Sequence, residues 1–192
     1  AFSGLEIACW DILGKARDRP VWALLGGRMN DRLRAYTYLY PQPGQDPVAF
    51  FHDADAHGAE AARRVEEDGF TALKFDPAGP YTIRGGHQPA MRDIARSARF
   101  CAAIRAGVGD RADLLFGTHG QFTPAGAIRL ARAIEPHAPL WFEEPVPPDD
   151  VAGMAQVAAA TALPLATGER LTTKAEFAPL LAARAVSIVQ PA

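Results

Sequence analysis

Two glutamates in the sequence have a spacing that suits metal chemistry. Glu143 and Glu169 each end a short apolar segment, and they lie 26 residues apart. If both segments are strands of one parallel barrel, both carboxylates reach the same mouth. Converging carboxylates repel each other unless a cation lies between them, and hard divalent ions prefer oxygen ligands. The pair therefore predicts a metal site, with salt-bridged glutamates at the rim of the fold as the alternative.

Three more polar side chains occupy similar positions after earlier apolar segments. Lys74 and Asp76 lie two residues apart, which puts them on one face of a strand, and His119 follows the next apolar segment. As structural alternatives, Lys74 could form an ion pair with Asp76 or a glutamate, and His119 could be a satisfied histidine of the barrel core.

The residues that follow the two glutamates are expected to be structural. Side chains alternate between the two faces of a strand, so Glu144 is predicted to point away from Glu143, into the layer between sheet and helices. Pro145 would end the strand there. Arg170, the neighbour of Glu169, is predicted to be a structural ion-pair partner.

A repeated strand–helix pattern positions these residues. The sequence predicts strands near residues 33–41, 70–76, 112–119, 140–144, 163–169 and 186–191. The segments between them have apolar residues three and four positions apart, as amphipathic helices do. Two of these helices begin with a capping residue followed by proline, at Asp46-Pro47 and Thr123-Pro124. The first is expected to run to about Asp68. This alternation predicts an α/β protein with parallel strands.

Two α/β architectures fit this pattern, an open doubly wound sheet and a (β/α)8 TIM-type barrel. No glycine-rich phosphate-binding motif follows the first strand, which argues against a dinucleotide-binding fold. Polar residues gather at the C-terminal ends of the predicted strands, where barrel enzymes have their active sites. We therefore predict an incomplete barrel in residues 31–192, with about six of the eight βα units present, and a chain that is part of a longer protein.

Four segments carry a resemblance to a known family: "SGLEIACWDILGKARDRPVWALLGG", "WFEEPVPPDD", "ATGERL" and "SIVQP". Together they resemble the enolase superfamily, in its mandelate racemase/muconate lactonizing enzyme branch, which includes sugar-acid dehydratases. The resemblance covers almost the whole chain. It implies that residues 1–30 are the end of a capping domain that leads into the barrel. It also implies Mg²⁺, or Mn²⁺, bound by carboxylates after strands three to five, with Glu143 and Glu169 among them. The ion would polarise a substrate carboxylate while a base, for which Lys74 matches, removes the α-proton. In members with Asp76 in place of the second lysine, Lys74 could instead orient the substrate.

The sequence departs from the family pattern at three positions. Asp76 stands where many members have a second lysine. Gly117 stands where the family has an aspartate ligand, and His119 follows it two residues later on the same face. The resemblance implies that His119 is either the acid that protonates a departing β-hydroxyl or a replacement ligand, and an imidazole ligand would favour Mn²⁺ or Zn²⁺. Ala192 stands where many members have an aspartate of a histidine dyad, which argues against a two-base racemase.

The loop of residues 77–89 is long for a connection between a strand and a helix. It would lie on the catalytic side, where loops often determine specificity. Its side chains Tyr81, Arg84 and His87 are candidate substrate-binding residues, with solvent-facing positions as the alternative. The other histidines, among them His57, are expected on helix surfaces or in loops.

Composition excludes several classes of partner. The chain has 192 residues, 48% of them hydrophobic and 22% charged, and a formal net charge of −2. This near-neutral balance gives no reason to expect binding to nucleic acid or to a membrane. We expect a cytoplasmic protein, homo-oligomeric at full length, in which Cys9 and Cys101 are reduced thiols.

The leading functional hypothesis is the metal-dependent dehydration of a sugar acid, an aldonate or aldarate, which makes the protein a lyase that binds a small-molecule carboxylate. His119 favours this hypothesis because dehydration needs an acid near the leaving group. A racemase or cycloisomerase of the same superfamily is the first alternative. The second is a relative without catalytic activity, or an inactive fragment.

Overall fold

The computed structural model describes residues 2–79 and 86–191. The chain divides into two compact units, Ala1–Arg34 and Ala35–Ala192. The shorter unit contains helices α1 (Phe2–Ala16) and α2 (Val21–Leu24). The turn after α1 closes through a hydrogen bond from the Arg19 amide to the Gly14 carbonyl, 2.9 Å long. A side chain at position 14 would meet that turn, because a Cβ there would lie 2.8 Å from the Arg19 oxygen.

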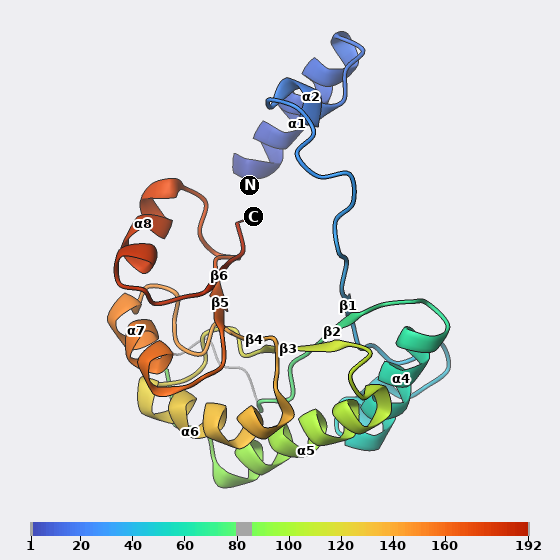
Figure 1. Cartoon of the computed structure of the whole chain (residues 1–192), viewed down its shortest axis with the longest axis vertical. Helices are drawn as coiled ribbons and strands as arrows, with labels where there is room; N and C mark the ends of the chain where they lie inside the picture. Colours follow the sequence, from blue (N-terminus) through green and yellow to red (C-terminus); the bar gives the residue numbers. More distant parts are fainter. Residues whose placement is uncertain (1, 80–85, 192) are drawn as a thin grey trace. The chain divides into compact units, whose positions relative to one another are not determined.

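The larger unit is a parallel sheet of six strands in the order β1-β2-β3-β4-β5-β6. The strands are β1 (Thr37–Tyr38), β2 (Ala72–Phe75), β3 (Asp113–Gly117), β4 (Trp141–Glu143), β5 (Leu165–Thr167) and β6 (Ile188–Val189). The helices between them are α3 (Pro47–Phe50), α4 (Ala54–Glu66), α5 (Met91–Val108), α6 (Pro124–Ile134), the 3-10 turn η1 (Glu135–His137), α7 (Val151–Ala160) and α8 (Lys174–Ala182). In Figure 1, helices α4 to α8 lie along the outer side of the curved sheet.

The strand order distinguishes between the two predicted architectures. Each strand pairs in parallel with the next one in the sequence, from β1 through β6. A doubly wound sheet would reverse its order at a switch point, whereas a barrel adds its strands in sequence. The prediction of an incomplete barrel is therefore confirmed.

Capping residues begin several helices shortly after the strand ends. Thr123 accepts a hydrogen bond from the Gly126 amide, and Asp150 accepts one from the Gly153 amide at 2.8 Å. Asp53 caps α4 by accepting from two backbone amides. This cap divides the helix that was predicted from Asp46 to Asp68 into α3 and α4, because a capping residue has non-helical backbone angles.

The two faces of the sheet differ in chemistry. Phe75, Phe116 and Phe142 lie side by side on neighbouring strands, with ring centroids 5.5 and 5.8 Å apart, and belong to the hydrophobic core. Because side chains alternate along a strand, the residues next to them, such as Lys74 and Glu143, face the other side. That side is the interior of the partial barrel, where the predicted site residues lie.

His57 contradicts the prediction that it lies on a helix surface. Only 3% of it is exposed, and its ring packs against those of Phe50 and Phe100, with centroids 4.2 and 4.7 Å away. It belongs to the contact between α4 and α5, which buries this face of the helix. Burial lowers the pKa of His57 below its usual value.

Two further expectations concern the thiols and the membrane. Cys9 and Cys101 are both free, as predicted, and Cys101 is buried. Within the described ranges, no helix combines the length and the apolar character that crossing a bilayer requires.

Candidate functional site

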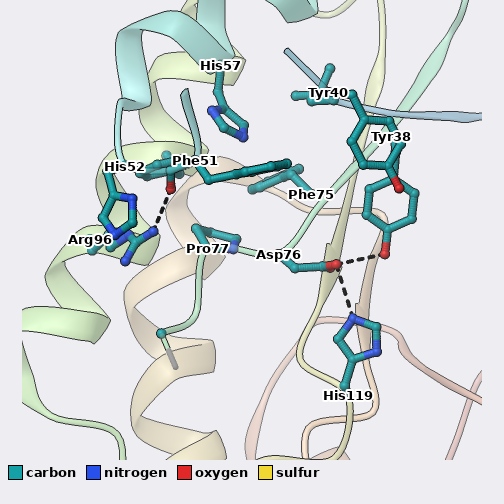
Figure 2. Close-up of a pocket in the computed structure, with 13 residues that line it drawn as sticks. Tyr38, Tyr40, Phe51, His52, His57, Phe75, Asp76, Pro77, Arg96 and His119 are labelled. Carbon is teal, nitrogen blue, oxygen red and sulfur yellow. Dashed lines mark hydrogen bonds and ion pairs between the residues drawn. The ribbon is translucent and has the colours of Figure 1, made fainter. Parts of the chain in front are cut away.

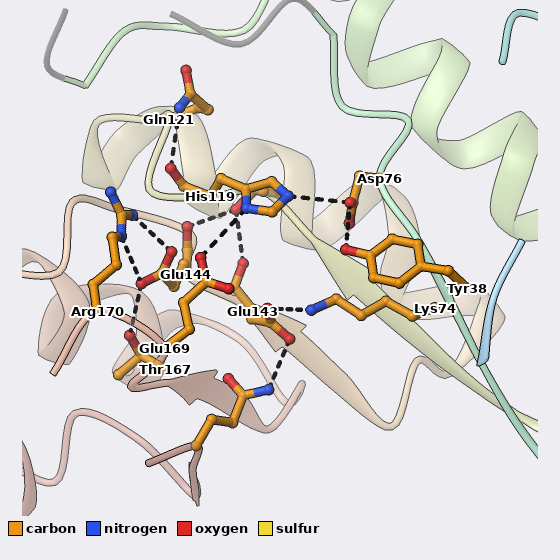
Figure 3. Close-up of polar contacts among 12 residues, drawn as sticks. Tyr38, Lys74, Asp76, His119, Gln121, Glu143, Glu144, Thr167, Glu169 and Arg170 are labelled. Carbon is orange, nitrogen blue, oxygen red and sulfur yellow. Dashed lines mark hydrogen bonds and ion pairs between the residues drawn. The ribbon is translucent and has the colours of Figure 1, made fainter. Parts of the chain in front are cut away.

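A buried ion pair joins the ends of β2 and β4. The Lys74 ammonium donates to Glu143 Oε1, and the two residues are 4% and 2% exposed. The second oxygen of Glu143 accepts a hydrogen bond of 2.9 Å from the Gln190 amide, which follows β6. Figure 3 shows the side chain of Lys74 reaching the Glu143 carboxylate. Of the three roles predicted for Lys74, the structure displays the ion pair with a glutamate.

The prediction that Glu144 points away from the site is wrong. The backbone of Glu144 has a φ of 44°, so the alternation of strand side chains ends at Glu143. The Glu144 carboxylate, fully buried, accepts hydrogen bonds of 2.7 and 3.3 Å from Arg170. Burial raises the pKa of Glu144, and Arg170 opposes that shift. The prediction that Arg170 is an ion-pair partner is confirmed.

A threonine fixes this unusual end of β4. The Thr118 hydroxyl lies 2.9 Å from the carbonyl oxygen of Glu143 and 2.7 Å from that of Glu144. The Gly120 amide donates to the same Glu144 oxygen at 2.7 Å. The segment after β3 therefore holds the end of β4 in place, which keeps the two neighbouring carboxylates at fixed positions.

His119 lies between two carboxylates. Its Nε2 is 3.1 Å from Asp76 Oδ2, and its Nδ1 is 3.5 Å from Glu169 Oε1. The hydrogen bond with Asp76, supported by the charges of both carboxylates, raises the pKa of His119 above the usual value of 6.5 although partial burial opposes the shift. The imidazole is 36% exposed, so it can reach a bound molecule. A protonated imidazole in this position can donate a proton.

Asp76 makes contacts that the sequence did not indicate. The Tyr38 hydroxyl donates to Asp76 Oδ2 at 2.7 Å, the same oxygen that faces His119. The carboxylate of Asp76 also leans over Gly117, where a Cβ would lie 2.0 Å from Asp76 Oδ1. Sequence reasoning assigned no role to Tyr38, and the only available signal was its position in the first predicted strand.

The donor atoms present suit a divalent ion. Among the described residues, His119, Glu144 and Glu169 each offer a ligand atom, and these atoms all lie within 4.8 Å of one another. Carboxylate oxygens and an imidazole nitrogen are ligands for Mg²⁺ and Mn²⁺. Two of the three ligands predicted from the sequence, Glu169 and His119, are thus brought together. The third, Glu143, is next to Glu144 in the chain and forms the ion pair with Lys74.

A cavity of about 720 Å³ opens beside Asp76 and His119. Its aromatic wall includes Tyr38 and Tyr40, whose rings stack with centroids 5.4 Å apart. Arg96, from α5, lies on the opposite side of the cavity in Figure 2 and donates to the carbonyl of a neighbouring segment. The volume is within the range of small-molecule sites, roughly 300–1,000 Å³.

The predicted substrate-binding loop is described only in part. Tyr81 and Arg84 lie outside the described residues. The His87 backbone exchanges hydrogen bonds with Gln121 and Thr123, and its ring packs against Phe122 with a centroid distance of 5.3 Å. These contacts attach the end of the loop to the segment that follows β3. They leave the predicted substrate role of His87 untested.

Comparison with known proteins shows the family of this chain. Residues 56–192 match the family described as enolase C-terminal domain-like. The chain belongs to this family. A structure described as a mandelate racemase/muconate lactonizing enzyme-like protein from Roseovarius sp. TM1035 is 70% identical, with a TM-score of 0.95, and the match covers 100% of this chain and 48% of that one. The resemblance predicted from four sequence segments is thereby confirmed.

Two curated relatives of this enolase family member are sugar-acid dehydratases. D-xylonate dehydratase from Haloferax volcanii is 36% identical over 194 residues, which cover 100% of this chain and 45% of the relative. D-gluconate dehydratase from Thermoproteus tenax is 32% identical over 191 residues, which cover 100% of this chain and 36% of the relative. The chain thus spans less than half the length of these relatives.

Proposed function

We propose that the protein removes the α-proton of a carboxylate substrate with the help of a divalent ion. We further propose that the substrate is a sugar acid, an aldonate or aldarate, which then loses its β-hydroxyl as water. The observation that carries this proposal is the position of His119 between Asp76 and Glu169, beside a cavity large enough for such a molecule. The sugar-acid dehydratases among its relatives support the same reaction.

The proposed ion is Mg²⁺, with Mn²⁺ as a substitute. Glu143 ends β4, Glu169 follows β5, and Glu144 places a further carboxylate near Glu169. These residues would hold the ion. When bound, it would stabilise the negative charge that develops on the substrate carboxylate as the α-proton leaves.

Two side chains, His119 and Lys74, are proposed to take part in the proton transfers of this reaction. His119 is the proposed acid for the β-hydroxyl, because two carboxylates hold its imidazole and its ring remains partly exposed. Lys74 is the proposed base or substrate-orienting residue at the end of β2. Its ammonium is 5.4 Å from the centre of the ring of Tyr38, and Tyr38 lines the cavity together with Asp76.

The test is a dehydration assay with the full-length protein. D-gluconate, D-xylonate, D-galactonate and a set of aldarates are incubated with Mg²⁺, and the α-keto acid product is measured. We expect activity on at least one acid, loss of activity with a chelator, and recovery when Mg²⁺ is restored. Absence of product from every sugar acid tested would contradict the proposed reaction.

Variants separate the acid from the rest of the site. His119→Asn should lower kcat/KM by about 10² to 10⁴-fold, the usual contribution of a general acid. His137→Asn is the matched control, because His137 ends the 3-10 turn η1 and lies outside the group of site residues. Equal activity of the His119→Asn variant and the unaltered protein would remove His119 from the mechanism.

A further inference from the structure

Strand β3 ends in a glycine at the point where its neighbours present charged side chains. The pairing of β2 with β3 joins Lys74 to Leu115 and Phe75 to Phe116, so one residue further on Asp76 stands beside Gly117. The pairing of β3 with β4 joins Gly117 to Glu143. Asp76, Gly117 and Glu143 therefore form a row across three adjacent strands, on the interior face of the sheet.

The space above Gly117 is occupied by the side chain of its neighbour. A Cβ built on Gly117 would lie 2.0 Å from Oδ1 and 3.0 Å from Cγ of Asp76, and 3.4 Å from Cε of Lys74. Atoms of a close-packed interior cannot approach to 2.0 Å. Asp76 can hold this position only because residue 117 has no side chain, and its carboxylate lies where an acidic residue of β3 would begin.

Two donors fix the orientation of this carboxylate. Tyr38 donates to Oδ2 at 2.7 Å, and His119 Nε2 lies 3.1 Å from the same oxygen. Both contacts involve Oδ2. The other oxygen, Oδ1, lies over Gly117. The side chain of Asp76 is 14% exposed, and it therefore borders the cavity without being freely solvated.

We propose that Asp76 supplies, from β2, the metal-binding carboxylate that β3 lacks. Asp76 and Gly117 then form a compensating pair, in which the loss of a side chain on one strand makes room for the carboxylate of the next. This inference rests on the proposed metal-dependent function. It also leaves His119 free of any need to replace a missing carboxylate, which is consistent with its proposed role as the acid.

Calorimetric titration of Mn²⁺ into the full-length protein tests this inference without measuring activity. Asp76→Asn keeps the size of the side chain and removes its charge, and it should weaken Mn²⁺ binding by about 100-fold or more, beyond the roughly 10 to 100-fold typical of groups that only orient a ligand. Tyr38→Phe is the control. It removes one hydrogen bond to Asp76 and should weaken binding by about 10 to 100-fold, less than Asp76→Asn does.

A double variant tests whether a carboxylate on β3 can replace that of Asp76. Asp76→Ala/Gly117→Asp removes the crowded side chain and restores an acidic residue on β3. Its Mn²⁺ affinity should return to within about 10-fold of the unaltered protein, measured on samples whose circular dichroism matches that protein. Recovery would mean that the site needs a carboxylate at this point, whichever strand supplies it.

Three results would overturn the inference. If Asp76→Asn binds Mn²⁺ as tightly as the unaltered protein, Asp76 is no ligand, although the proposed function stands. If Asp76→Asn and the double variant lose binding equally, the effect belongs to the lost contacts with Tyr38 and His119. If the unaltered protein binds no Mn²⁺, the proposed function fails, and this inference fails with it.

Discussion

Replacing Lys74 with methionine should cost the protein much of its stability. Lys74 and Glu143 form a buried ion pair whose side chains are 5% and 3% exposed. Methionine has a similar length and no charge, so Lys74→Met leaves the Glu143 carboxylate buried without its cation. Removing one partner of a buried pair typically costs about 3–5 kcal/mol, because the remaining charge is uncompensated.

The structure favours the lower end of that range. Glu143 Oε2 keeps its hydrogen bond of 2.9 Å from Gln190, and a hydrogen bond to a charged group contributes about 1.5–3 kcal/mol. We therefore expect Lys74→Met to lower the free energy of unfolding by about 3 kcal/mol. The double variant Lys74→Met/Glu143→Gln removes the uncompensated charge as well, and it should regain at least half of that loss.

Urea unfolding followed by circular dichroism measures these differences in the absence of divalent ions. Lys15→Met is the matched control, because Lys15 forms an exposed pair with Asp11 in which the side chains are 77% and 56% exposed. A surface substitution of this kind should change stability by no more than about 0.5 kcal/mol. If Lys74→Met costs less than about 1 kcal/mol, or if the double variant is no more stable than the single one, Glu143 is not a buried charge and the reasoning fails.

Three further predictions concern the packing around the site. Burial lowers the pKa of His57, so at mildly acidic pH the unfolded chain binds a proton at this residue more readily than the folded protein does. The contribution of the neutral, buried His57 to the free energy of unfolding is therefore complete above pH 6.5 and is lost as the pH falls through the lowered pKa. His57→Gln should flatten this dependence of the urea midpoint between pH 7.5 and 5.5, and an equal slope in both proteins would contradict it. Burial also raises the pKa of the Cys101 thiol, so a thiol reagent should modify Cys101 only after unfolding; mass spectrometry showing rapid modification of the native protein would refute this. Thr118→Val should lower stability by about 1 kcal/mol, since each carbonyl that its hydroxyl faces keeps a backbone donor; a loss above about 3 kcal/mol in urea unfolding would indicate that the hydroxyl contributes more than these contacts.

The sequence predicted the order of the elements because their signals are local. Apolar segments bounded by turn residues indicated all six strands, although each is shorter than expected; β1, for example, is limited to Thr37–Tyr38. Capping residues were equally informative. Thr123, predicted to begin a helix, accepts a hydrogen bond from the Gly126 amide at the start of α6. These features depend on residues only a few positions apart, so the sequence displays them directly.

The details of the site depend on contacts between strands, which the sequence does not display. The direction of Glu144 was predicted wrongly because alternation assumes extended backbone, and its φ of 44° departs from it. The burial of His57 depends on how α4 packs against α5. The contact of Asp76 with Gly117 depends on the lateral register of β2 and β3. The sequence showed that Gly117 departs from the family pattern. Only the structure shows that the carboxylate of Asp76 lies over Gly117.

The central claim, metal-dependent removal of an α-proton followed by loss of water, is tested most directly in heavy water. A sugar acid that the full-length protein accepts is incubated with Mg²⁺ and followed by proton magnetic resonance. Dehydration breaks the bond to the α-proton, releases the β-hydroxyl as water, and gives an enol that takes a deuteron from the solvent. The account predicts an α-keto acid carrying deuterium on its β-carbon, formed only when Mg²⁺ is present. Deuterium at the α-carbon of an otherwise intact acid would indicate an isomerase, and product formed equally well with a chelator would contradict the metal-dependent reaction.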